Sequence, residues 1–167
     1  MKNIFETLVP KAAGIGAEHP LAKALMGREN VMELTQKSHD AALTPMNSGG
    51  LSHAVRAALA CRIARHNNEA FLAEHYKCMI GRGDDAQAAS MIANPANTGG
   101  NDARLAAIVR HTDLVAVSPK DATAQDIEAL KLVGVPDDDI VRLSELIDFI
   151  SYQVRLVAGL RLMAEVA

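Results

Sequence analysis

The chain has 167 residues, enough for one domain with one core but not for a second independent core. Apolar residues make up 49% of it and aromatic residues only 3%, so we expect an all-α core of Ala, Leu, Ile, Val and Met. A net charge of −3 without a basic cluster argues against a nucleic-acid partner, and no run of about 18 apolar residues favours a membrane span. The N-terminus also lacks the apolar run of a signal peptide, which predicts a cytoplasmic protein.

The first 48 residues predict an N-terminal helical extension. Prolines and glycines interrupt its beginning, so only short helical pieces are expected there. Residues 29–43 alternate apolar and polar side chains with a helical period and predict one helix of modest length. Residues 44–50, Thr-Pro-Met-Asn-Ser-Gly-Gly, end it.

A hairpin of two helices is predicted next. Ser52 is placed to cap an Ala-rich helix that continues to about His66. Asn67 and Asn68 interrupt the pattern, and residues 69–80 predict the second helix. Gly81 follows it and suits the left-handed conformation that ends a helix.

Three shorter helices are predicted after the hairpin. The first covers about residues 84–93 and stops at an Asn-Pro pair, and the second covers about residues 102–117. Thr123 begins the third with Asp126 three residues later, in an acidic variant of the capping box, and Gly134 closes it.

The last predicted helix, about residues 137–165, is the longest. Apolar residues recur along it every three or four positions, at Ile140, Leu143, Ile147, Ile150, Val154, Val157 and Leu160. Such a stripe indicates a buried or partner-facing seam. Ala158 and Gly159 would allow a neighbouring backbone to approach closely.

Two stretches of the chain resemble a known family. They are residues 49–68, GGLSHAVRAALACRIARHNN, with the following Leu-Ala-Glu-His-Tyr at 72–76, and residues 121–130 together with 153–160. Both resemble the AhpD-like (alkylhydroperoxidase, or carboxymuconolactone decarboxylase, CMD) domain family. The resemblance implies a single all-α domain over residues 1–167, with a core helix hairpin and a long C-terminal helix. It also implies a homo-oligomer: a dimer, trimer or hexamer.

The catalytic groups of that family are replaced in this chain. Its peroxidases carry a glutamate on the first core helix, a Cys-x-x-Cys at the start of the second and a histidine four residues later. The matching positions here are Ala57, Glu69, Leu72 and Tyr76. None of these residues can form the sulfenic acid and disulfide of the thiol cycle. We therefore expect a catalytically degenerate protein that acts as an oligomeric scaffold, or as the non-catalytic partner of a paralogue that retains the cysteines.

A displaced thiol pair is the first alternative. Cys61 and Cys78 lie at similar distances on either side of the hairpin turn and could face each other. His75 lies three residues before Cys78 and could lower the pKa of its thiol. A peroxidase-related oxidoreductase would use this pair. The competing interpretation is that both cysteines are small buried apolar residues.

A thiol-independent enzyme is the second alternative. His75 and Glu74 would supply acid–base groups, and Arg56 would bind the carboxylate of a small substrate. The competing interpretation is that Arg56, Arg62 and Arg65 form a solvated or intersubunit helix face.

No metal and no cofactor is expected from the sequence. His53, His66 and His75 lack the spacing of metal ligands on one helix face, and the Gly-Gly pairs lack the companions of a phosphate loop. A module that binds a small apolar ligand between the helices is a third possible function class.

Overall fold

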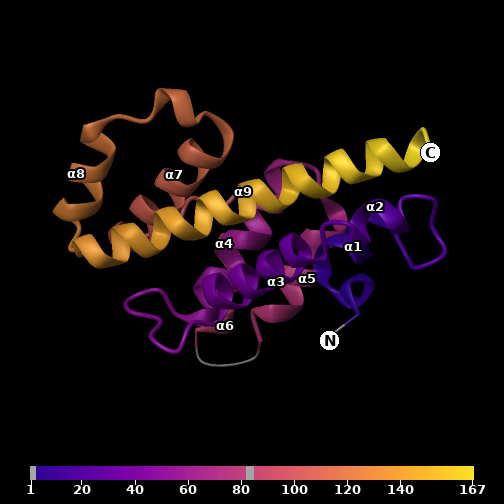
Figure 1. Cartoon of the computed structure of the whole chain (residues 1–167). Helices are drawn as coiled ribbons and strands as arrows, with labels where there is room; N and C mark the ends of the chain where they lie inside the picture. The colour runs from indigo at the N-terminus through magenta and orange to yellow at the C-terminus, as the bar shows by residue number, and fades with distance from the viewer. Residues whose placement is uncertain (1–2, 82–84) are drawn as a thin grey trace.

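Helix α9 (Asp137–Glu165) crosses the whole molecule, and the other helices are arranged around it (Figure 1). The computed structural model describes residues 3–81 and 85–167, and no β-strand occurs within these ranges. The prediction of an all-α fold is therefore confirmed. None of the helices in this part of the chain combines the length and the apolar character that crossing a membrane requires.

The predicted hairpin is present as α4 (His53–His66) and α5 (Ala70–Met79). Ser52 caps α4 as predicted, because its hydroxyl accepts a backbone N–H from the first turn. The turn between the helices holds Asn68 in the left-handed region, with φ 56°, which Asn adopts more readily than most residues. Gly81 has φ 77° just after α5 and allows the chain to leave the helix.

The N-terminal part contains two short helices and one longer one. A 3-10 turn, η1 (Ile4–Glu6), leads into α1 (Leu8–Ala13), and α2 (Ala22–Met26) and α3 (Glu29–Leu43) follow. The bounds of α3 are the predicted ones. Apolar side chains from these elements belong to the same buried cluster as those of α4 and α9. The N-terminal part therefore shares the main core.

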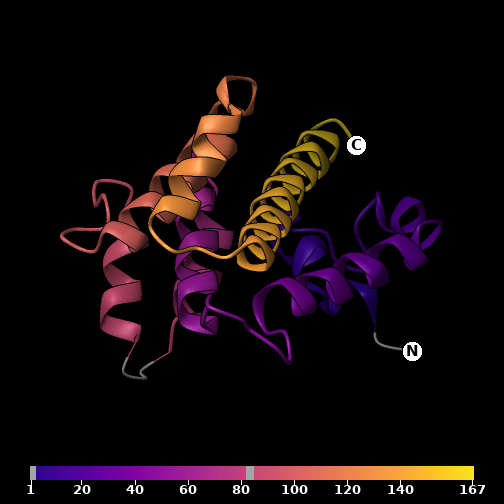
Figure 2. The ribbon, with the colours of Figure 1, turned by 90° about the vertical axis from the view of Figure 1, so that its left-hand side faces the viewer.

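The elements between the hairpin and α9 are α6 (Ala86–Ile92), α7 (Ala103–Val117), the 3-10 turn η2 (Pro119–Asp121) and α8 (Ala124–Leu132). The start predicted at Asp84 lies outside the described residues. Thr123 and Asp126 form the predicted capping box at the start of α8. Figure 2 shows α7 and α8 on one side of α9 and α3 on the other.

The predicted apolar stripe of α9 lies at the centre of the core. Its members are all buried: Ile140, Leu143, Ile147, Ile150, Val154, Val157 and Leu160. Through them α9 packs against α1, α3, α4, α7 and α8. Each buried side chain of this size contributes roughly 1.5–3 kcal/mol to folding relative to an exposed one. Of the two predicted roles for the stripe, buried or partner-facing, the structure shows the buried one.

Arg62 of α4 is 1% exposed, so the solvated helix face considered for the α4 arginines is wrong for this residue. Its guanidinium donates to both carboxylate oxygens of Asp113 on α7, at 2.5 and 2.6 Å. It also donates to the backbone carbonyls of Ile92, Asn94, Pro95 and Asn97. Arg62 therefore ties α4 to α7 and to the loop between α6 and α7.

Replacing Arg62 by Met is expected to lower the free energy of unfolding by roughly 3 kcal/mol, because Asp113 and the loop carbonyls lose their donor. The matched control is Arg110→Met on α7. Arg110 is exposed, and its ion pair with Asp126 should contribute about 1 kcal/mol or less. Urea titrations followed by circular dichroism measure both changes. Equal losses in the two variants would contradict the anchoring role of Arg62.

Candidate functional site

His39 on α3 and His75 on α5 face each other across the gap between these helices. His39 is 5% exposed, and His75 is half-buried. Their Nε2 atoms are 3.4 Å apart and their ring centres 5.5 Å apart, so each ring directs its Nε2 edge toward the other. The fold thus pairs the predicted residue His75 with a histidine that lies 36 positions earlier in the chain.

Asp40 and Gln36 fix the orientation of His39. Oδ1 of Asp40 lies 3.0 Å from Nδ1 of His39, so this nitrogen donates its hydrogen to the carboxylate. Gln36 donates to the same oxygen at 2.9 Å, and its own carbonyl accepts the backbone N–H of Leu8 at 3.0 Å. These bonds connect the start of α1 to His39. They leave Nε2 of a neutral His39 with a free lone pair directed at His75.

His75 lies in the wall of a cavity of about 670 Å³, which we call the histidine pocket. The residues that line it are Asn3, Glu6, Thr7, Leu8, Lys11, Gln36, Asp40, Phe71 and His75. They come from η1, α1, α3 and α5. Two carboxylates and one ammonium group are among them, so the lining has a formal charge of −1. His75 is therefore accessible from a polar cavity with a slight excess of negative charge, and His39 lies buried behind it.

Burial lowers the pKa of His75, and His39 lowers it further, because a positive charge on one ring opposes a positive charge on the other. The imidazole of His75 is therefore neutral near pH 7. A neutral imidazole has a nitrogen lone pair, which can accept a proton or bind a metal ion. These are the two kinds of chemistry that the geometry of the pair permits.

Tyr76 supports the histidine pair from the core side. Its ring stacks on that of His39, with ring centres 5.9 Å apart and an angle of 22° between the planes. Its hydroxyl donates to the side-chain carbonyl of Gln153 on α9. Burial raises the pKa of Tyr76, so the hydroxyl keeps the proton that this bond requires. Helix α9 thus fixes α5 at the residue next to His75.

Glu74 lies apart from His75 although the two are neighbours in sequence. Its side chain is exposed and binds the ammonium group of Lys77 at 3.0 Å. It does not line the histidine pocket. The structure therefore does not bring Glu74 and His75 together in one site.

The two cysteines lie in different environments, and both are free thiols. Cys61 is fully buried in α4, and burial raises the pKa of its thiol. Cys78 is exposed at the end of α5, with its sulfur 4.0 Å from Oε1 of Glu74. The interpretation of both cysteines as buried residues is correct for Cys61 and wrong for Cys78.

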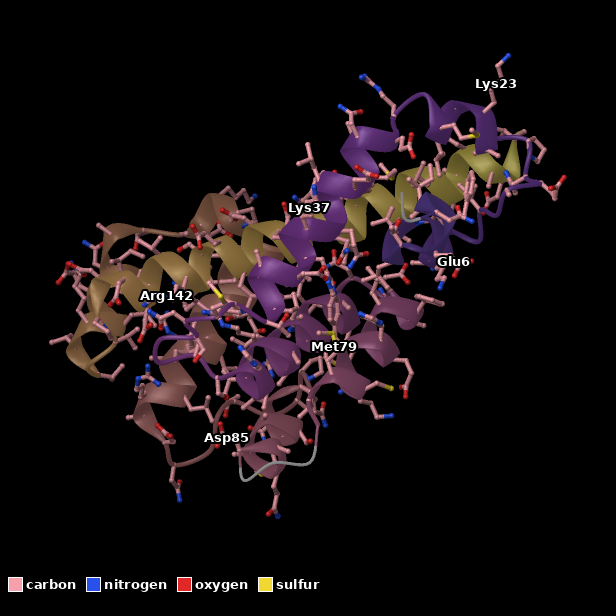
Figure 3. All side chains as sticks on the ribbon, turned by 60° about the horizontal axis from the view of Figure 1, so that its bottom comes forward. Glu6, Lys23, Lys37, Met79, Asp85 and Arg142 are labelled. Carbon is pink, nitrogen blue, oxygen red and sulfur yellow. The ribbon has the colours of Figure 1, made fainter. Side chains whose placement is uncertain are left out.

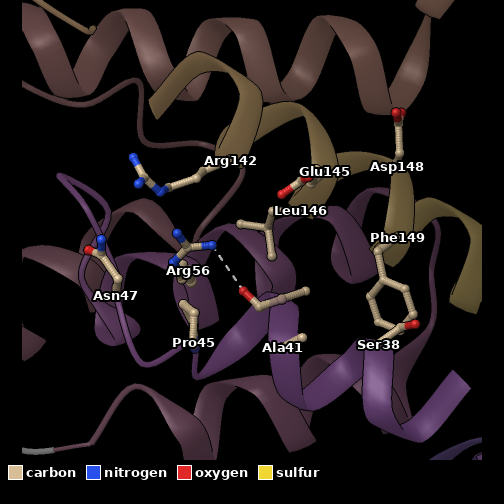
Figure 4. A pocket seen from close by; sticks show the side chains of 11 residues that line it. Ser38, Ala41, Pro45, Asn47, Arg56, Arg142, Glu145, Leu146, Asp148 and Phe149 are labelled. Atoms are coloured by element: carbon tan, nitrogen blue, oxygen red, sulfur yellow. Dashed lines mark hydrogen bonds between the residues drawn. The ribbon is translucent and has the colours of Figure 1, made fainter. Parts of the chain in front are cut away.

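Arg56 lies at a second cavity, of about 610 Å³, between α3, the loop after it and α9. Arg56, Arg142 and Asn47 form one end of this cavity, and Ser38 and Phe149 form the other (Figure 4). It shares no lining residue with the histidine pocket. Glu6 of the histidine pocket and Arg142 of the second cavity lie far apart along the molecule (Figure 3).

The guanidinium of Arg56 is used mainly for backbone bonds. It donates to the carbonyls of Ala42, Ser48 and Leu51 at 3.0 Å each. These bonds hold the end of α3 and the following loop against α4. Arg56 is buried, so the solvated helix face is wrong here as well. The structure places Arg56 away from His75, and the two do not form one substrate site.

Sequence reasoning missed His39, Asp40 and Gln36. A signal for His39 was present, because it falls on the same face of the predicted helix as Met32 and Leu43, which are both buried. A histidine on the apolar face of an amphipathic helix must find a polar partner there. The identity of that partner depends on how α5 packs on α3, which no local pattern contains.

A comparison of the sequence with models of protein families gave no match, and no curated protein matched it either. In residues 3–81 and 85–167, no three His, Cys, Asp or Glu side chains are grouped closely enough to hold a metal ion by themselves.

One of the two thiols is expected to react quickly with a chromogenic thiol reagent in the folded protein, and the second only after denaturation. The reason is that Cys78 is exposed, whereas Cys61 is buried and its pKa is raised. The variants Cys78→Ser and Cys61→Ser assign the phases, since only Cys78→Ser should lack the fast one. Two fast thiols in the folded wild-type chain would contradict the described burial.

Proposed function

We propose that this chain is an AhpD-like (CMD) protein that has lost thiol-dependent peroxide reduction and acts as an oligomeric scaffold, or as the non-catalytic partner of a paralogue. The observation that carries the proposal is the state of the four positions at which the family resemblance puts catalytic groups. All four are now used for packing or for structural polar contacts.

Three of these positions belong to the apolar core or its edge. Ala57, Leu72 and Tyr76 are buried, and Leu72 and Tyr76 are completely inaccessible. A peroxide could not reach a residue at position 72 without a rearrangement of α4 and α5. The tyrosine hydroxyl is already bound to Gln153. The side chains at these three positions therefore contribute to helix packing and provide no group for thiol chemistry.

The fourth position, Glu69, has a structural task. Its carboxylate caps α5 by accepting the N–H groups of Phe71 and Leu72. It also pairs with Arg161 of α9, which in turn donates to the carbonyl of Ala12. A thiol at this position would leave Arg161 without its partner. Glu69 and Arg161 together thus connect α1, α5 and α9.

The displaced pair Cys61 and Cys78 gives little support to a peroxidase. A peroxidatic cysteine needs a lowered thiol pKa and access to peroxide. Cys61 has a raised pKa and no exposed surface, while Cys78 has access but lies beside the carboxylate of Glu74. Cys61 therefore meets neither requirement, and the side chain in contact with the sulfur of Cys78 is acidic.

An exposed face near the end of α9 supports the oligomeric part of the proposal. Ala158, Gly159, Leu162 and Met163 lie along it at helical spacing, and Leu162 is 64% exposed. A Cβ built on Gly159 would meet no atom within 4 Å, so packing within the chain does not require this glycine. Small and apolar residues on one exposed face suit close contact with a second copy of the chain.

A thiol-independent enzyme that acts on a small substrate through His75 is the second candidate. The histidine pocket favours it, because the pocket gives a small molecule access to a neutral imidazole. Glu74 and Arg56 have no part in this form of the hypothesis, since both lie outside the pocket. Its activity would survive replacement of both cysteines.

The purified protein is expected to consume hydrogen peroxide in the presence of a dithiol no faster than the double variant Cys61→Ser, Cys78→Ser. A coupled assay of dithiol oxidation measures both rates, with a Cys-x-x-Cys peroxidase as the positive control. Turnover that is at least tenfold above that of the double variant would overturn the proposed loss of thiol chemistry.

The wild-type chain is expected to run as a homo-oligomer, and the double variant Leu162→Asp, Met163→Asp as a 17.8-kDa monomer, because paired carboxylates on the exposed α9 face oppose its burial. Size-exclusion chromatography with light scattering measures both masses. The control is Leu132→Asp, a change at an exposed leucine of α8, which should leave the mass unchanged. A monomeric wild type, or an oligomer that survives the double change, would contradict this role of α9.

A further inference from the structure

We propose that His39 and His75 together bind a divalent transition-metal ion of the zinc class through their Nε2 atoms, at the wall of the histidine pocket. The inference goes beyond the proposed function and does not depend on it. It rests on the spacing of the two nitrogens, on the hydrogen bonds behind His39 and on the cavity that His75 lines.

The distance between the two Nε2 atoms fits a shared metal ion better than a hydrogen bond. They are 3.4 Å apart, whereas a hydrogen bond from a nitrogen donor usually spans about 2.7–3.2 Å. Zinc–nitrogen bonds of about 2.0–2.1 Å at the tetrahedral angle separate two ligand nitrogens by about 3.3–3.4 Å. The observed spacing is therefore that of two imidazoles on one tetrahedral ion.

The hydrogen bonds behind His39 are those of a metal-binding histidine. Such a residue usually donates its second ring N–H to a carboxylate, which fixes the ring and increases its basicity. His39 donates from Nδ1 to Asp40, and Gln36 binds the same carboxylate. Leu8 in turn holds Gln36. The free lone pair of His39 is thus oriented toward His75 before any ligand arrives.

The surroundings of the pair favour a cation. The pocket lining has a formal charge of −1, from Glu6 and Asp40 against Lys11. Tyr76 stacks on His39 and restricts its movement on the core side.

The site offers two protein ligands, because no third His, Cys, Asp or Glu of the described residues joins the pair. The remaining positions of the ion would face the pocket and hold water or a small oxygen-donor ligand. Catalytic zinc sites have three protein ligands and one open position, and structural sites have four protein ligands, so an ion held by this pair would keep more open positions than either. Imidazole ligands select zinc, copper, nickel or iron over magnesium and calcium.

The test is a titration of untagged, chelator-treated protein with Zn²⁺ by calorimetry and with Co²⁺ by visible absorption. We expect one ion per chain and the absorption bands of tetrahedral Co²⁺. His75→Gln should abolish both signals. Asp40→Ala should weaken Zn²⁺ binding about 10–100-fold, since it removes the carboxylate behind His39 but neither of the two ligands. His53→Gln is the matched control, because His53 is exposed on α4 and should leave binding unchanged.

His39→Gln should also abolish binding, and a thermal melt of each variant shows whether the fold is retained. His75 is only half-buried, so His75→Gln carries the test if the His39 variant unfolds. Absence of stoichiometric binding to wild-type protein would overturn the inference, as would binding that persists in His75→Gln or disappears in His53→Gln. Peroxide turnover and oligomer mass are separate measurements, so failure of the metal site leaves the proposed function standing.

Discussion

The burial of the apolar stripe of α9 is the constraint on which the rest of the structure depends. Its side chains provide the surface that α1, α3, α4, α7 and α8 share, so the positions of these helices relative to one another are set through α9. Two polar contacts also attach neighbouring helices to α9. Tyr152 contacts Thr35 of α3 at 3.2 Å, and Gln153 accepts the hydroxyl of Tyr76 on α5. The spacing of His39 and His75 follows from these attachments.

In this chain, the residues that pack the helices together are different from the residues that form the histidine pair. Each of the four positions that the family resemblance singles out has an apolar or a structurally bound side chain. His75 lies one position before Tyr76 on α5 and lines the histidine pocket. The same helices therefore pack apolar residues in one place and bring polar groups together in another, because sites and folds are specified by different residues.

The helices were predictable from the sequence because their ends are specified locally. Ser52, Thr123 and Gly81 define boundaries through contacts within a few residues, and the 3–4 spacing in α9 reports its buried face directly. The candidate site was only partly predictable. His75 was identified, but its partner comes from another helix, and the burial of Arg56 and Arg62 depends on carbonyls far from α4 in sequence. Those contacts are products of tertiary packing, which short-range patterns do not encode.

The contact between Glu69 and Arg161 connects the end of α9 to two other helices. Arg161 binds this carboxylate and the carbonyl of Ala12, and it precedes Leu162 and Met163 by one and two positions. A force that shifts the last turns of α9 is therefore transmitted to the first turn of α5 and to the end of α1. Both helices line the histidine pocket, α5 through Phe71 and α1 through Leu8. The guanidinium group of Arg161 thus links the last turns of α9 to two of the helices that line the pocket.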